Sequence, residues 1–117
     1  MVVEMQEIAT LEELHTFEAC NVAVRVLQVS ASWCKRCGTL REELAGAFDG
    51  AEGVALGRIV IDEVEGAEEA LDVQWLPRVD ILGKHRVQLE GSNCVIGTVL
   101  AEVARARPPV LLLDDDF

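Results

Sequence analysis

The sequence predicts an α/β fold in which a central mixed β-sheet carries helices on both faces. Segments rich in β-branched residues alternate with segments whose apolar residues recur at helical spacing, in the order strand–helix–strand–helix–strand–helix–strand–strand–helix. Strand–helix–strand units place their strands in parallel, whereas the last two strands flank a short turn and form an antiparallel hairpin. With 117 residues, 50% of them hydrophobic, the chain is long enough for one domain with one core.

The predicted strands differ in their apolar pattern. The first alternates loosely, as a short edge strand does. The next two are almost continuously apolar, which is typical of strands buried on both faces. The last two are the arms of the hairpin, joined by Gly83-Lys84-His85. The predicted strands span residues 2–8, 22–29, 54–61, 79–82 and 86–89.

The predicted helices are marked by residues that start and stop them. Thr10 and Glu13 form a capping box at the first helix. Gly50 is expected to stop the second helix, whose apolar face carries Cys37, Leu40, Leu44 and Phe48. Asn93 is the expected N-cap of the last helix, which Pro108-Pro109 would end. The helices are therefore expected over residues 11–19, up to Gly50, over 65–71, and between Asn93 and Pro108.

Charge and hydropathy exclude several classes of function. Lys and Arg number 10 against 21 Asp and Glu, which gives a formal net charge of −11 and opposes binding to nucleic acid and to anionic membranes. The first residues lack the basic and apolar regions of a secretory signal, and no apolar run approaches the ~18 residues of a membrane span. We therefore expect a soluble, cytoplasmic, monomeric protein without nucleic-acid or membrane partners.

Two cysteines form the candidate chemical site. Cys34 and Cys37 follow a predicted buried strand and open a predicted helix, and cysteines at this spacing can close a small disulfide ring. The unpaired amides and the positive dipole end of the helix favour a thiolate on the first sulfur. A thiolate is the nucleophile of disulfide exchange. Because Cys37 shares its helix face with Leu40 and Leu44, we expect Cys34 to be exposed and attacking, and Cys37 to be sheltered and resolving.

Residues 2–107 resemble the thioredoxin family. The resemblance rests on Trp33 next to the cysteine pair, on Ile61-Asp62 at a strand end, on Leu76-Pro77 further along, and on Gly91 before the last helix. It implies the thioredoxin fold and a thiol–disulfide oxidoreductase that acts on protein disulfides without a cofactor. It also implies a cis-proline at Pro77 facing the disulfide, and a disulfide reductase or small dithiol as electron donor.

The residues between and beneath the cysteines depart from this family. Thioredoxins have Gly-Pro where this chain has Lys35-Arg36, two cations that would stabilise a thiolate and raise the reduction potential. The alternative is that both side chains point into water and are screened. Gln28 stands where thioredoxins have a buried aspartate implicated in proton transfer for the resolving cysteine. An amide accepts no proton at neutral pH, so either water or a nearby carboxylate substitutes for the aspartate or the second step is slow. The alternative is that Gln28 is merely a hydrogen-bonded polar side chain.

Three further departures concern the surroundings of the proline. Trp75 replaces a glycine of the family, and we interpret it either as an aromatic docking surface or as a partly buried core residue. Arg78 replaces a threonine and is expected to add positive charge near the sulfurs. Arg58 matches a lysine beneath the family's active site, and it is expected either to pair with a carboxylate such as Asp62 or to be a surface residue without a role. Together with the cations of the motif, these arginines would form a positive site that selects acidic substrates.

Other interpretations remain open. Cys20 and Cys94 are expected to be small buried apolar residues. A zinc site needs about four ligands, which one cysteine pair and two isolated cysteines supply poorly, so no metal is expected. The chain divides into a thioredoxin-like domain over residues 1–107 and an acidic tail over residues 108–117. The alternative function is a partner-binding subunit or redox sensor, in which the disulfide controls association instead of turning over a substrate.

Overall fold

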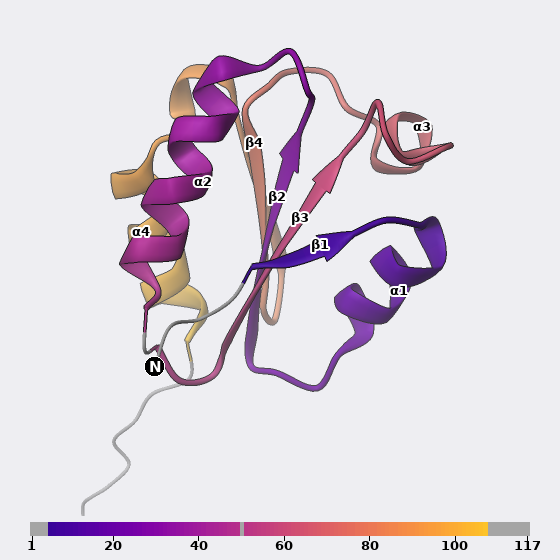
Figure 1. Ribbon diagram of the computed structural model, residues 1–117. Helices are drawn as coiled ribbons and strands as arrows, with labels where there is room; N and C mark the ends of the chain where they lie inside the picture. Colours follow the sequence, from indigo (N-terminus) through magenta and orange to yellow (C-terminus); the bar gives the residue numbers. More distant parts are fainter. Residues whose placement is uncertain (1–4, 50, 108–117) are drawn as a thin grey trace, which may run out of the picture.

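The protein folds around a five-stranded β-sheet (Figure 1). Its structure is a computed structural model that describes residues 5–49 and 51–107. The strand order is β1-β3-β2-β4-β5, with β2 in the centre. β1, β3 and β2 are parallel, whereas β4 is antiparallel to β2 and β5 is antiparallel to β4. The strands are β1 (Gln6–Ile8), β2 (Val24–Ser30), β3 (Val54–Val60), β4 (Arg78–Leu82) and β5 (Arg86–Glu90).

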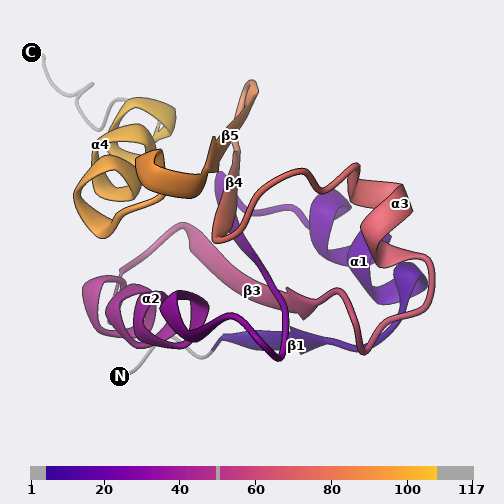
Figure 2. The ribbon, with the colours of Figure 1, turned by 90° about the horizontal axis from the view of Figure 1, so that it is seen from above.

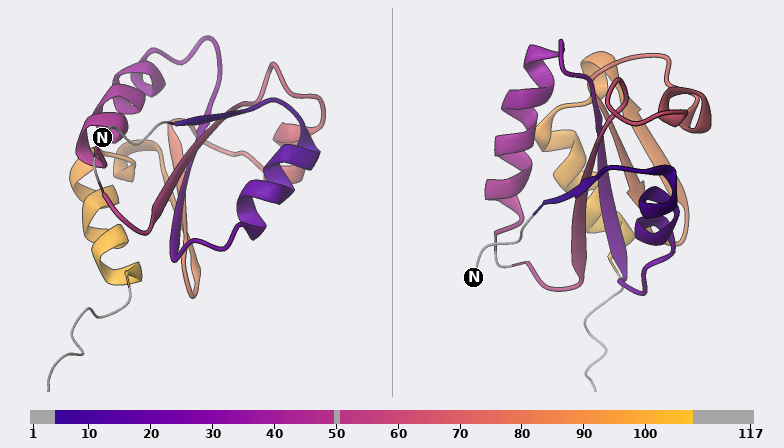
Figure 3. Two further views of the ribbon diagram at one scale, coloured as in Figure 1. Left: turned by 60° about the horizontal axis from the view of Figure 1, so that its bottom comes forward. Right: turned by 45° about the vertical axis from the view of Figure 1, so that its right-hand side comes forward.

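Helices cover both faces of the sheet: α1 and α3 lie on one face, and α2 and α4 on the other (Figures 2 and 3). Alternate residues of β2 point to opposite faces. Val24 and Val26 pack on the side of α2 and α4, whereas Leu27 and Val29 pack on the side of α1 and α3. The core is therefore two apolar layers, which explains the continuous apolarity of this strand. The helices are α1 (Leu11–Ala19), α2 (Lys35–Ala47), α3 (Ala67–Leu71) and α4 (Ile96–Ala106).

The predicted fold class and the order of the elements are confirmed. The capping box of α1 is also present, with one change of partner. The Glu13 amide donates to the Thr10 hydroxyl oxygen at 3.0 Å, and the Glu13 carboxylate accepts from the amide of Ala9, not of Thr10, at 2.7 Å. Two otherwise unpaired amides at the helix start are satisfied in this way, so a local sequence pattern was enough to place α1.

The expected start of the last helix is wrong. Asn93 is not the N-cap of α4, because Gly91–Asn93 form a 3₁₀ turn and α4 begins at Ile96, after extended backbone at Val95. The cause is Gly91, which has a left-handed φ of 61° and turns the chain directly after β5. The expected helix stop at Pro108-Pro109 and the acidic tail lie outside the described residues, as does Gly50. In the part of the chain that is described, no helix is long and apolar enough to cross a membrane.

Candidate active site

The cysteine pair lies at the start of α2, directly after the carboxyl end of the central strand. Cys34 and Cys37 form a disulfide with their Cα atoms 5.3 Å apart. Cys34 is the N-cap of α2, and its sulfur accepts a hydrogen bond from the Cys37 amide at 3.2 Å. Cys34 is partly exposed, whereas Cys37 is fully buried. Substrate sulfur therefore reaches Cys34 first, at a helix end whose amides and dipole favour negative charge.

The turn before the cysteines is anchored to the neighbouring strand. The Ser32 amide donates to one carboxylate oxygen of Asp62 at 2.9 Å, and the Ser32 hydroxyl donates to the other. These two hydrogen bonds, that from the hydroxyl first, lower the pKa of Asp62 below its ordinary value. The Cys34 amide also donates to the carbonyl of Ala31 at 3.0 Å. The role of Ser32 is not predictable from the sequence, because its partner is 30 residues away and no local pattern marks the pair.

Gln28 lies directly beneath the disulfide. Its side chain is fully buried, and its Nε2 donates to the Cys37 carbonyl at 2.7 Å. Its Oε1 is buried without a hydrogen-bond partner. A buried acceptor without a partner costs about 1–3 kcal/mol. Gln28 therefore fixes the first turn of α2 through one end of its amide, at the backbone of the resolving cysteine, and holds an unused acceptor at the other end.

The loop before β4 supplies the other wall of the site. The Leu76–Pro77 peptide bond is cis. Pro77 is buried and Leu76 is half-buried, and the Pro77 carbonyl accepts from the Gly91 amide at 2.9 Å. Trp75 is 68% exposed, which decides between its two interpretations: it is a surface aromatic residue and not a core residue. Trp33, beside the cysteines, is 71% exposed.

Lys35 and Arg36 are exposed, and in the described part of the chain neither side chain makes an ion pair or a hydrogen bond. Arg36 also lines a cavity of about 230 Å³ together with Pro77 and Cys94. Burial raises the pKa of the Cys94 thiol to about 11, against the attraction of the Arg36 charge, which lowers it. Cys94 is thus a buried protonated thiol, whereas Cys20 is only half-buried.

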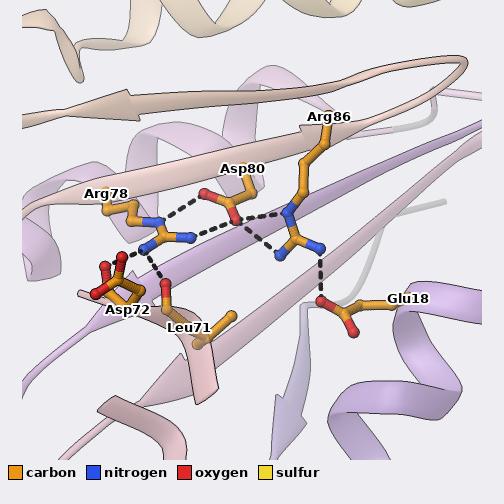
Figure 4. A network of polar contacts seen from close by, with 6 residues as sticks. All are labelled: Glu18, Leu71, Asp72, Arg78, Asp80 and Arg86. Carbon is orange, nitrogen blue, oxygen red and sulfur yellow. Dashed lines mark hydrogen bonds and ion pairs between the residues drawn. The ribbon is translucent and has the colours of Figure 1, made fainter. Parts of the chain in front are cut away.

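The expectation that Arg78 adds positive charge near the sulfurs is wrong. Arg78 is buried, with 1% of its side chain exposed, on the α1/α3 face of the sheet, opposite to α2 (Figure 4). Its guanidinium binds both carboxylate oxygens of Asp80 at 2.8 Å. The reason is strand alternation: Arg78 shares a face with Asp80, and this face is turned away from the disulfide. Its charge is neutralised by Asp80 within the protein.

Arg58 does pair with a carboxylate, but Asp62, the suggested partner, is wrong. Arg58 pairs with Glu7 of β1 at 3.0 Å, because these two residues stand opposite each other in the parallel register of β1 and β3. The Asp62 carboxylate instead accepts a hydrogen bond from the Ser32 amide. Of the basic residues expected around the cysteines, Lys35 and Arg36 alone are exposed at the motif. The positive site is therefore smaller than the sequence suggested.

An acidic groove that the sequence did not predict lies on the surface beside α3. It has a volume of about 770 Å³ and extends from the end of β3 along α3. The signal was present in the sequence as a dense run of Asp and Glu, but a charge run alone does not show that the side chains converge on one hollow. The acidic residues lining it are Asp62, Glu63, Glu65, Glu68, Glu69 and Asp72. Among the described residues no group of three or more His, Cys, Asp or Glu side chains is placed to hold a metal ion.

Comparison with solved structures relates this fold and site to known proteins. Thioredoxin from Fasciola hepatica superposes with a TM-score of 0.76 at 19% identity, over 88% of this chain and 100% of that chain. Chloroplastic thioredoxin z superposes with a TM-score of 0.74 at 26% identity, over 91% of this chain and 96% of that one. A structure of ferredoxin:thioredoxin reductase in complex with thioredoxin f2 matches with a TM-score of 0.76 at 15% identity, over 92% and 98%. No protein-family model and no curated protein matches the sequence.

The α/β architecture is thus the thioredoxin fold. The resemblance to the thioredoxin family is confirmed by these neighbours together with the disulfide between two cysteines three residues apart. Fold and cysteine pair support a thiol–disulfide oxidoreductase in general terms.

Proposed function

We propose that this protein exchanges dithiols and disulfides with protein substrates, using Cys34 as nucleophile and Cys37 as resolving cysteine. The observation that carries the proposal is the unequal burial of the two sulfurs at one helix start: Cys34 is partly exposed and Cys37 is fully buried. An incoming disulfide meets only the first sulfur, while the second remains within reach of the bond that forms.

The reaction has two exchange steps. In the reduced protein, the Cys34 thiolate attacks one sulfur of a substrate disulfide, forming a mixed disulfide and releasing the other substrate sulfur as a thiolate that takes up a proton. Cys37 then loses its proton and attacks Cys34. The mixed disulfide breaks, the second substrate sulfur leaves as a thiol, and the protein is left with the Cys34–Cys37 disulfide. Two electrons pass from the protein to the substrate.

The loop before β4 is the proposed substrate platform. Among the described residues, the backbone groups of Trp75 and Leu76 make no hydrogen bond to other backbone groups. They are available to a substrate strand that pairs beside Pro77. Trp33, next to the cysteine pair in the chain, and Trp75, two residues before Pro77, offer exposed aromatic rings for apolar contact. Lys35 and Arg36 would stabilise the Cys34 thiolate, which raises the reduction potential and is checked by redox titration.

The electron donor in this proposal is a disulfide reductase or a small dithiol. One structural neighbour, thioredoxin f2, is seen with ferredoxin:thioredoxin reductase, which supports a reductase partner in general terms. Cys20 and Cys94 are free thiols, consistent with a reducing compartment such as the cytoplasm. The proposal includes a monomeric domain over residues 1–107, followed by a tail over residues 108–117.

Insulin reduction driven by dithiothreitol tests the proposal. We expect turnover by the wild type and none by Cys34→Ser, while Cys20→Ser, the matched control at a free cysteine, keeps wild-type activity. Cys37→Ser should accumulate the mixed disulfide, which is detected by mass spectrometry. A folded wild type that cycles its own disulfide without reducing insulin would favour the redox-sensor alternative, which the absence of a titratable group at Gln28 supports.

A further inference from the structure

A network of charges lies on the α1/α3 face of the sheet, buried at Arg78 and Asp80 and partly exposed at Arg86 and Glu18 (Figure 4). At its centre the Asp80 carboxylate, fully buried, accepts hydrogen bonds from two guanidinium groups. Arg78 binds it through both oxygens at 2.8 Å, and Arg86 binds one of the same oxygens at 2.8 Å and 3.0 Å. Arg86 also pairs with Glu18 of α1 at 2.7 Å. The two arginines therefore share one carboxylate but reach different parts of the protein.

Arg78 reaches the loop that carries the proposed substrate platform. Its Nη1 donates to the carbonyl of Leu71 at 2.6 Å and to that of Asp72 at 3.4 Å. These carbonyls lie at the end of α3, where backbone acceptors lack helical partners and the dipole is negative. Asp72 has a left-handed φ of 51° and turns the chain from the helix into the loop. The guanidinium thus binds the chain where α3 ends and the loop begins, at Leu71 and Asp72.

The same arginine also holds the other end of the loop. Residues 72–77 run from the end of α3 to the proline, and the next residue in the chain is Arg78 itself, fixed in β4 by pairing with β2 and β5. Arg78 therefore contacts both ends of the segment. Its side chain binds the carbonyls at the start, and its backbone follows Pro77 at the end. We call the contact of Arg78 with Asp80 and the two carbonyls the loop clasp. Trp75, Leu76 and Pro77 all lie within the closed segment.

We propose that Arg78 is a positioning residue whose clasp sets the conformation of the 72–77 loop and thereby the affinity for protein substrates. This inference rests on the proposed function, since it assigns a role to the loop of the same site. A buried ion pair is weak evidence for stability, because well-packed apolar residues often stabilise a fold as well or better. An apolar pair in place of Arg78 and Asp80 would leave the carbonyls of Leu71 and Asp72 without the hydrogen-bond donors that Arg78 provides. The clasp therefore serves loop geometry, for which small displacements matter strongly.

The network offers a matched pair of variants. Arg78→Met removes the donors to the loop and leaves Asp80 paired with Arg86, so the buried carboxylate keeps a partner. Arg86→Met removes an arginine from the same carboxylate but leaves the contacts of Arg78 with Asp80 and with the loop intact. Both variants lose one positive charge from one network. Only the first one opens the clasp.

Two measurements decide the proposal. Amide hydrogen exchange at Asp72 and Val73, the two loop residues whose amides donate to backbone carbonyls of α3, should become about tenfold faster in Arg78→Met and stay unchanged in Arg86→Met. The insulin concentration for half-maximal reduction should rise about tenfold in Arg78→Met, whereas reduction of a small aromatic disulfide, which needs no loop pairing, should change by less than about twofold. Unchanged exchange and unchanged half-saturation in a folded Arg78→Met variant would overturn the proposal, and so would equal effects of the two variants.

The test remains decisive if a variant is unstable or the proposed function fails. Arg78→Met/Asp80→Leu removes the buried carboxylate together with its partner and should fold even where the single variant does not. If this variant also fails to fold, Arg78 is a determinant of the fold and the proposal is overturned. If wild-type protein does not reduce insulin, the proposed function is refuted, while hydrogen exchange still shows whether the clasp holds the loop.

Discussion

Gln28 is a polar side chain in direct contact with the backbone of the resolving cysteine. It is fully buried, it donates to the Cys37 carbonyl, and its Oε1 has no partner. We predict that Gln28→Asp accelerates insulin reduction by about tenfold, at the lower end of what general acid–base catalysis contributes. A carboxylate at this position can take up the proton that Cys37 must lose, and burial raises its pKa toward neutrality.

Gln28→Asn is the matched control for this prediction, because it has the shape of the aspartate without a titratable group. It should leave the rate unchanged or lower. Stopped-flow measurement of the second exchange step, over a range of pH, separates the two variants: the aspartate should add a pH dependence that the asparagine lacks. Equal rates for both variants would mean that proton uptake at this position does not limit the reaction.

Cys94 illustrates how burial alone changes a titration. Burial raises the pKa of its thiol from 9.0 to about 11, with Arg36 lowering it and the charges of Asp80 and Glu90 raising it further. The folded form therefore keeps a proton that the unfolded chain loses, so its contribution to stability is complete below pH 9 and is lost as the pH rises towards 11. Urea unfolding across this window should show a steeper loss for wild type than for Cys94→Ala. Parallel pH profiles would contradict the assignment.

At the scale of secondary-structure elements, β3 and α1 meet at a glycine. A Cβ atom on Gly57 would lie 2.8 Å from Cε1 of Phe17, which is itself buried in the layer beneath α1. We predict that Gly57→Ala destabilises the protein by about 1–3 kcal/mol through overpacking. Gly46→Ala in α2, where the added Cβ has nothing within 4 Å, should instead stabilise by about 0.5–1 kcal/mol. Urea unfolding of both variants checks the opposite signs.

The elements were more predictable than the partners of individual side chains. Strand and helix periods, and the cap at Thr10, are encoded within a few neighbouring residues, so the order of elements followed from the sequence. The neighbours of Arg58 and Arg78 depend on strand register and on which face of the sheet each residue occupies. The start of α4 is not predictable from Asn93 for a related reason. An asparagine caps a helix only if the chain before it turns suitably, and here the turn at Gly91 places Asn93 in a 3₁₀ turn ahead of the helix.

The whole molecule distributes its ten basic residues unevenly. Most of them are engaged with acceptors of the protein, whereas the exposed pair at the motif is not, in the part of the chain that the structure describes. The basic residues with hydrogen-bond acceptors are Arg25, Arg41, Arg58, Arg78, Arg86, Arg105 and Arg107. Asp62 lines the acidic groove and also accepts a hydrogen bond from Ser32, which lies just before the motif, so the groove adjoins the site. The site thus has a cationic side at α2 and an anionic side at the end of β3.

This asymmetry predicts a substrate preference that depends on Lys35 and Arg36. Peptide disulfides with Asp or Glu next to cysteine should be reduced faster than peptides with Lys at low salt, and Lys35→Gln/Arg36→Gln should lower kcat/KM for the acidic peptides about fivefold. Lys84→Gln is the control, because Lys84 is also exposed but lies in the β4–β5 turn, at the opposite end of β2 from the motif. Because exposed charges are screened, about 1 M salt should remove the preference, and a preference that survives it would show that charge is not its cause.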